Sequence, residues 1–274
     1  MKNVLSYFKD SHVHTVNSHD GKSTIKEYLE NAKNHHVDEI TFTDHYDIYD
    51  GVKTELKTLD VDKYRQNYDQ ETKNAAIKTH FGIEIGLRPE AESKIKEMVK
   101  KHHFDFIIGS SHITCGIDVA MNRTAFFKED EPISYGINKY FDEVLKNISI
   151  YDDEFDVYGH LDYIIRYARG DPQPLPYDDY REIIDQILRA LIKKGKGIEV
   201  NSSGIRYGIG TPHPRTEIVR RYIELGGKIV TLGSDAHRVE DLAASFGVVR
   251  YLLIRAGVRE IAVYENREPR FMKI

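Results

Sequence analysis

Short runs rich in β-branched and aromatic residues alternate with longer amphipathic runs along most of the chain. Residues 24–36 and 89–103 show the spacing of amphipathic helices, with Thr24 and Glu27 placed as a capping box and Pro89 near the start of the second helix. The predicted strands are residues 8–14, 38–44, 80–86, 104–112, 155–160, 196–203 and 227–235, with 259–266 as a further, outer strand. This alternation predicts parallel β/α units, in either an open sheet or a barrel.

Residues that can bind metal ions stand at the ends of almost all of these strands. In an open doubly wound sheet, ligands gather at one switch point and use few strand ends. In a β/α barrel, the carboxyl ends of all strands meet at one mouth. Residues of this kind at six strand ends therefore favour the barrel, and they are His12, His14, Asp44, His45, Glu84, His112, His160, Asp235 and His237.

The stretch "DSHVHTVNSHDG", residues 10–21, brings three histidines close together. Side chains alternate along a strand, so His12 and His14 lie on one face, about 7 Å apart at the backbone, which suits a shared metal ion. The alternative is a pair of core histidines, but two adjacent buried rings would each need a separate hydrogen-bond partner. The segment "GSDAH" repeats this spacing with Asp235 and His237.

The candidate ligands are too numerous for one ion. Seven of the thirteen histidines lie at or just beyond strand ends, and together with Glu84 and Asp235 they exceed the three protein ligands of one catalytic zinc. The surplus indicates two or three ions. Closed structural zinc sites usually use cysteines at short spacing, and the only cysteine here is Cys115. The other histidines are assigned to helix ends or left outside the site, and they are His35, His36, His80, His102, His103 and His213.

Two arginines are placed to reach over the same mouth. Arg166 lies six residues after His160, and Arg206 follows the sixth predicted strand. A guanidinium group offers paired hydrogen bonds to a phosphate, which a lysine does not reproduce. A surface salt bridge is the alternative for either residue alone. Their shared position above a multi-metal site favours a phosphate substrate.

Composition and charge exclude several other classes. The 274 residues, 40% of them apolar, suffice for a full core, and we expect a single domain over 1–274. The net charge of −5 and the dispersed lysines and arginines argue against a nucleic-acid partner. A single cysteine excludes an internal disulfide, and no apolar run approaches the roughly 20 residues that span a bilayer. We therefore expect no membrane partner and a cytoplasmic location.

The motifs "SHVH", "TDH", "GIEIG", "GSSHIT", "GHLD" and "GSDAH", in this order, resemble the polymerase-and-histidinol-phosphatase (PHP) superfamily over nearly the whole chain. The segments "GHLDYIIRYA", "EVNSSGIRYGIGTPHP" and "TLGSDAH" are similar to its histidinol-phosphate phosphatase branch. The resemblance implies a distorted (β/α)7 TIM-like barrel with a trinuclear site, usually of zinc, iron or manganese.

The resemblance also implies which residues hold each metal. His12, His14, Glu84 and Asp235 would hold the first, and Glu84 would bridge to a second held by His112 and His160. The third would be held by His19, His45 and His237. Asp20 competes with His19, because several relatives have Ser-Asp-Gly where this chain has "SHDG". Segments 46–60 and 113–135 match nothing in the family, and they are the loops expected to contact the amine and imidazole of the substrate.

The resulting hypothesis is a metal-dependent phosphatase of histidine biosynthesis, which hydrolyses L-histidinol phosphate by attack of a hydroxide held between two metals. Arg166 and Arg206 would bind the phosphate, and Asp44, or a water on the third metal, would protonate the leaving group, with Asp162 as the second candidate. Three alternatives remain open at this point. They are a PHP nuclease, a PHP phosphatase acting on nucleotides or phosphotyrosine, and a metal-binding or storage protein.

Overall fold

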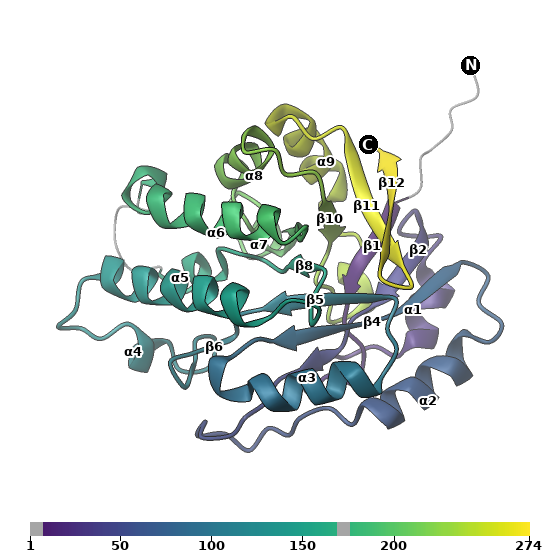
Figure 1. The fold of residues 1–274 in the computed structure, drawn as a ribbon. Coiled ribbons are helices and arrows are strands. Elements are labelled where there is room, and N and C mark those ends of the chain that lie inside the picture. The colour runs from purple at the N-terminus through teal and green to yellow at the C-terminus, as the bar shows by residue number, and fades with distance from the viewer. Residues whose placement is uncertain (1–7, 169–175) are drawn as a thin grey trace.

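Seven parallel strands lie side by side in the order β1-β2-β4-β5-β8-β9-β10 in the computed structural model, which describes residues 8–168 and 176–274 (Figure 1). Each corresponds to one predicted run, so the strand predictions are confirmed. The strands are β1 (Phe8–Val13), β2 (Val37–Phe42), β4 (Lys78–Gly86), β5 (Phe106–Ser110), β8 (Val157–Tyr158), β9 (Gly197–Asn201) and β10 (Val230–Gly233). A short strand, β3 (His45–Tyr46), also pairs with β4.

The sheet closes between its first and last strands. Val13 and Ala236 form a parallel bridge. The amide of His14 donates to the carbonyl of Ala236 at 2.8 Å, and the amide of Asp235 donates to the carbonyl of His12 at 2.9 Å. The fold is therefore a nearly closed barrel rather than an open sheet, as predicted. The same contacts join the two chain segments that carry the i, i+2 ligand pairs.

Helices flank the outside of the barrel (Figure 1). Thr24 caps α1 through the predicted capping box with Glu27, but α1 ends at Asn31, and His36 takes a positive φ of 56° before β2. No helix among the described residues is long and apolar enough to cross a membrane. The α-helices are α1 (Ile25–Asn31), α2 (Val61–Thr72), α3 (Glu92–Lys101), α4 (Arg123–Phe126), α5 (Ile133–Ile150), α6 (Arg181–Lys193), α7 (Ser203–Arg206), α8 (Thr216–Glu224) and α9 (Phe246–Ala256). Pro89–Ala91 form a 3₁₀ turn before α3, and the hairpin β6 (Ile113–Thr114) and β7 (Ile117–Asp118) follows β5.

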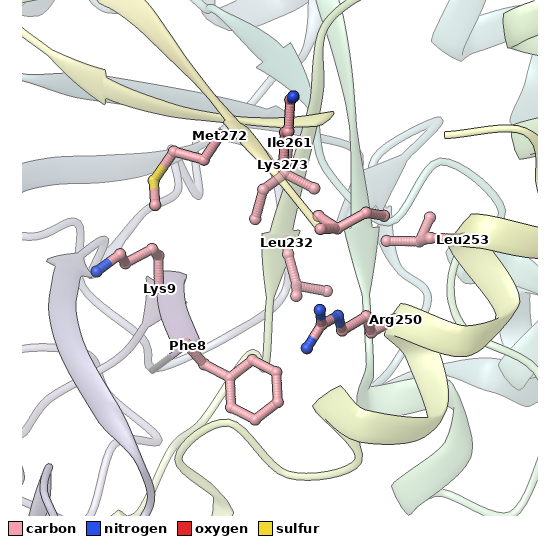
Figure 2. A pocket seen from close by; sticks show the side chains of 9 residues that line it. Phe8, Lys9, Leu232, Arg250, Leu253, Ile261, Met272 and Lys273 are labelled. Carbon is pink, nitrogen blue, oxygen red and sulfur yellow. The ribbon is translucent and has the colours of Figure 1, made fainter. Parts of the chain in front are cut away.

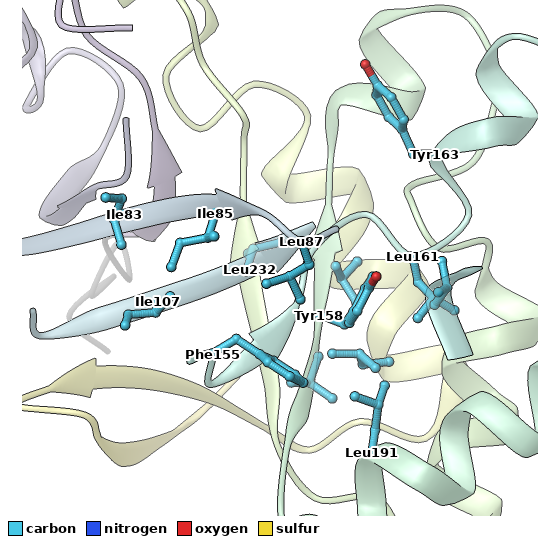
Figure 3. Packing of buried hydrophobic residues seen from close by; sticks show 14 of the residues in the cluster. Ile83, Ile85, Leu87, Ile107, Phe155, Tyr158, Leu161, Tyr163, Leu191 and Leu232 are labelled. Carbon is cyan, nitrogen blue, oxygen red and sulfur yellow. The ribbon is translucent and has the colours of Figure 1, made fainter. Parts of the chain in front are cut away.

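The main hydrophobic core lies between the strands and the helices. On β4, Ile83 and Ile85 are fully buried in this core, while Glu84 between them points to the opposite face, into the barrel. Figure 3 shows Ile83 and Ile85 with Ile107 of β5, and Leu191 of α6 packing from the helix side. Strand alternation therefore directs apolar side chains outward and leaves the inner face free for chemistry.

A hairpin closes the barrel at the N-terminal ends of its strands. The predicted outer strand is β11 (Glu260–Glu265), and it pairs with β12 (Glu268–Lys273). Ala262 and Tyr264 pack on Phe106 and Val157 in a second apolar cluster. The hairpin turn is fixed by the amide of Arg267, which donates to the carbonyl of Asp105 at 2.8 Å. The strand ends that carry the predicted ligands lie at the opposite end of the barrel.

A small cavity of about 50 Å³ lies between α9, β12 and the start of β1. Figure 2 shows its lining, which includes Phe8, Leu232, Leu253, Ile261 and Met272. None of the predicted site residues lines it. The candidate chemistry therefore lies elsewhere, at the mouth of the barrel.

Candidate metal centre

Four side chains from three strand ends converge at the first candidate metal position. The Nε2 atoms of His12 and His14 are 2.9 Å apart. The Oε2 atom of Glu84 lies 3.3 Å and 3.4 Å from these two nitrogens, and Oδ1 of Asp235 lies 3.9 Å and 3.4 Å from them. Ligand atoms about 2.0–2.2 Å from a tetrahedral zinc lie roughly 3.3–3.6 Å from one another. These four fully or nearly fully buried side chains therefore have the spacing that one ion requires.

The second candidate position shares Glu84 with the first. Its other oxygen, Oε1, lies 3.3 Å from Nε2 of His112 and 2.9 Å from Nε2 of His160. The two nitrogens are 3.5 Å apart. The hydroxyl of Ser110 donates to the same oxygen at 2.7 Å and fixes the carboxylate. Glu84 thus offers one oxygen to each of two neighbouring donor sets, which is the arrangement of a bridging ligand.

The third candidate position brings together His45, His237 and Asp20. The Nε2 atoms of the two histidines are 3.4 Å apart, and Oδ2 of Asp20 lies 3.7 Å from His45 and 3.1 Å from His237. His19, whose side chain is 32% exposed, approaches Asp20 to 3.8 Å. Burial acts to raise the pKa of Asp20, but the hydrogen bond with His237 and the neighbouring imidazoles hold it well below its ordinary value. Asp20 is therefore placed as a donor beside the histidine pair, with His19 next to it.

Two carboxylates and one imidazole of the donor set have the charges that cation binding needs. Burial acts to raise the pKa of Glu84, but the imidazoles of His12 and His112 hold it well below the usual range of a glutamic acid. Burial acts in the same way on Asp235, and the hydrogen bond with His14 and the charge of His12 hold its pKa well below the ordinary value. Burial and the surrounding imidazoles lower the pKa of His14. Ionised carboxylates and a neutral imidazole are the forms that bind metal. Burial acts to lower the pKa of His12, His45 and His112, but the neighbouring carboxylates raise it, so metal binding by these three would displace a proton.

Asp44 has a different environment from the ligand groups. Its oxygens accept hydrogen bonds from the amides of Thr15 and Ser18, at 2.7 Å and 3.0 Å, and from their hydroxyls, at 2.7 Å and 2.6 Å. The Ser18 hydroxyl in turn lies 3.2 Å from Nδ1 of His14. These contacts favour a role for Asp44 in holding the loop that carries the ligands. Proton donation by Asp44 stays a prediction.

Both predicted phosphate-binding arginines lie beside the centre. Arg166 donates to the hydroxyl of Ser203 at 2.7 Å, and its buried Nε has no hydrogen-bond partner among the described residues. Its guanidinium lies 5.0 Å from the ring of Tyr163, which is 4.8 Å from the ring of His160. Arg206 instead donates to the backbone carbonyls of Ser234 and Asp235, at 3.0 Å and 2.9 Å. Arg166 therefore has free donor capacity, whereas Arg206 is fixed to the segment of Asp235.

A family comparison agrees with this geometry. The profile of the PHP domain family matches residues 10–203, which include seven of the nine strand-end residues named above. The other two, Asp235 and His237, lie beyond the matched range. The chain belongs to the PHP domain family. The matched range begins in β1 and ends just after β9.

Several relatives of this PHP domain are named as histidinol-phosphatases or probable histidinol-phosphatases. A probable histidinol-phosphatase of Clostridium acetobutylicum is 30% identical, over 86% of this chain and 89% of the relative. The histidinol-phosphatase of Lactococcus lactis is also 30% identical, over 94% of each chain. A crystal structure of histidinol phosphate phosphatase from Lactococcus lactis, complexed with zinc, L-histidinol and phosphate, superposes with a TM-score of 0.83. It is 27% identical and covers 95% of this chain and 98% of that chain.

The PHP domain also contains residues that sequence reasoning did not single out. Asp47 accepts a hydrogen bond from Nδ1 of His112 at 3.0 Å, and Glu199 contacts Nδ1 of His12 at 2.5 Å. His213, left outside the predicted site, is buried and donates from Nδ1 to Asp162 at 2.6 Å. Asp162, the second candidate proton donor, is therefore already paired. Asp47 stands two positions after His45, and Glu199 stands two positions before Asn201, so alternation along a strand places each on the same face as that neighbour. This alternation is the sequence pattern that could have identified both residues.

Proposed function

We propose that this chain is a metal-dependent phosphomonoesterase that hydrolyses L-histidinol phosphate to L-histidinol and phosphate. The observation that carries the proposal is the position of Glu84, which offers one carboxylate oxygen to each of two sets of buried donors. The relatives named histidinol-phosphatase and the Lactococcus lactis structure with zinc, L-histidinol and phosphate support the choice of substrate.

The donor set fits two or three divalent ions of zinc, iron or manganese. Imidazole and carboxylate groups without thiolates suit these metals. Oε2 of Glu84 is buried among the imidazoles of His12, His14 and His45, and within residues 8–168 and 176–274 the buried Oδ1 of Asp20 has no hydrogen-bond partner, which is costly unless a cation lies nearby. The ions would be held by His12, His14, Glu84 and Asp235, by Glu84, His112 and His160, and by His45 and His237 with Asp20 or His19.

Bound divalent ions in such sites lower the pKa of water from 15.7 to about 7 and offset phosphate charge. The side chains of the protein would orient the phosphate and the metal ligands and would add further positive charge. The Nε–H of Arg166, which has no hydrogen-bond partner among the described residues, would donate to a phosphate oxygen, and Arg206 would add charge while it holds the Asp235 segment. Asp44, through Ser18, would keep the ring of His14 in position.

A panel of phosphate esters tests the proposal. We expect phosphate release from histidinol phosphate with a kcat/KM at least about tenfold above that for a nucleoside monophosphate, a phosphotyrosine peptide and a generic chromogenic ester. Phosphate is measured with malachite green, and a Glu84→Gln variant purified in the same way controls for contaminating phosphatases. A better rate with another ester would overturn the substrate assignment. No phosphate from any of the four would overturn the enzymatic function and favour a metal-binding protein.

A further inference from the structure

Glu199 makes contacts that the proposed reaction has not yet used. It lies on the inner face of β9 and is 1% exposed. Its Oε1 accepts a hydrogen bond from Nδ1 of His12 at 2.5 Å. Its Oε2 accepts from the backbone amide of His160 at 2.8 Å and from the side-chain amide of Asn201 at 3.2 Å. One carboxylate therefore holds a ligand of the first candidate metal position and a ligand of the second.

The neighbouring strand leaves room for this carboxylate. Gly233 of β10 lies beside Asn201 in the parallel register. A Cβ atom at Gly233 would lie 2.3 Å from Oε1 of Glu199 and 2.4 Å from Cβ of His12. Such distances are too short for any side chain, so the glycine is required for Glu199 and His12 to meet. The contact is thus built into two strands and not made by a mobile surface group.

The charge of Glu199 also needs an explanation. A buried carboxylate is costly unless it is paired and hydrogen-bonded. Among the described residues, His12 is the one basic side chain within ion-pair distance of Glu199. A carboxylate that accepts the Nδ1–H of a histidine fixes the ring and directs its Nε2 lone pair to a metal ion. A cation on the far side of the His12 ring would therefore account for the buried charge.

The hydrogen bond from the backbone amide of His160 to Glu199 affects the second candidate metal position. His160 has a positive φ of 22°, a backbone conformation that is strained for a residue with a side chain. The hydrogen bond from its amide to Glu199 helps to hold this conformation, and His160 in turn places Nε2 at 2.9 Å from Glu84. We propose that Glu199 is a positioning residue that orients His12 through its ring and His160 through its backbone, and so supports two adjacent metal ions at once. This inference rests on the proposed metal-dependent function.

Glu199→Gln tests the inference, with Glu39→Gln as the matched control. Glu39 is also a buried strand glutamate that accepts from a histidine, His80, at 2.7 Å, but it touches no candidate ligand and is held by Arg270. Metal per chain is measured by inductively coupled plasma mass spectrometry after equilibration with graded chelator. We expect Glu199→Gln to lose about two equivalents at a chelator concentration roughly 10–100-fold lower than wild type. Glu39→Gln should retain metal as wild type does, and excess Mn²⁺ should restore activity to Glu199→Gln.

Two outcomes would overturn the inference. One is wild-type metal retention in Glu199→Gln, and the other is metal loss equal to that of Glu39→Gln. If Glu199→Gln does not fold, as judged by circular dichroism, Glu199→Asp replaces it. The aspartate keeps the charge but is one methylene shorter, so it should release metal more readily than wild type, and unchanged release would again contradict us. A wild-type protein that binds metal but hydrolyses no ester would refute the proposed function, while the metal measurement still decides the role of Glu199.

Discussion

Replacing Glu84 with glutamine is expected to lower kcat/KM for histidinol phosphate by roughly a thousandfold or more, equivalent to about 4 kcal/mol of transition-state stabilisation. The two oxygens of Glu84 face different donor sets, at 3.3 Å from His12 and 2.9 Å from His160. Glutamine keeps the size of the side chain, but it removes the charge and leaves one oxygen. Both adjacent ions should therefore bind more weakly, and metal analysis should find fewer equivalents per chain.

The control for this variant is again Glu39→Gln, which changes a buried glutamate of β2 far from the donor sets. It should keep both its metal and its activity. Glu84→Gln protein that retains full metal content and hydrolyses histidinol phosphate within tenfold of the wild-type rate would show that Glu84 is not a bridging ligand. Circular dichroism of each variant separates loss of the site from loss of the fold.

Arg166→Ala is expected to lower kcat/KM by about 10²–10³-fold while bound metal stays unchanged. Arg166 contacts Ser203 and the rings of Tyr163 and Tyr207, and it has a buried Nε–H available for a phosphate oxygen. None of these contacts is with a candidate ligand. Steady-state kinetics and metal analysis of the same preparation check the two halves of the prediction.

Arg166→Lys is the matched variant, because lysine keeps the charge but not the paired donors of a guanidinium. It should recover only a small part of the lost rate. Full activity in the lysine variant would show that charge alone is needed, and loss of metal in either variant would show that Arg166 supports the ligands instead. Arg206 is a less selective probe, since its bonds to the carbonyls of Ser234 and Asp235 link it to a ligand segment.

The barrel could be predicted from the sequence because the strand runs show both an apolar face and metal-binding residues at their ends. The strand runs are apolar on their outer faces, as Ile83 and Ile85 show, and six of the seven barrel strands end in a residue suited to metal binding. Only a closed sheet brings so many strand ends together. The observed closure, with His14 bonded to Ala236, follows from this convergence.

The partners of the ligands could not be predicted in the same way. The sequence places Glu199 on an inner strand face, but its contact with His12 depends on how β9, β10 and β1 are staggered. The choice between His19 and Asp20 depends on the turn that contains them, where Oδ2 of Asp20 lies 3.1 Å from Nε2 of His237. The hairpin partner β12 was also missed, because "EPRFMK" has little of the alternation that marked β11. Contacts between distant segments, rather than local propensity, decide each of these features.

Anomalous diffraction from crystals of the protein purified without added metal tests the central claim most directly. Data collected on both sides of the manganese, iron and zinc absorption edges would locate and identify each ion. We predict two peaks on either side of the Glu84 carboxylate, one among His12, His14 and Asp235 and one between His112 and His160, with a third beside His45 and His237. No anomalous peak at these positions, in crystals of protein that releases phosphate from histidinol phosphate, would contradict the account.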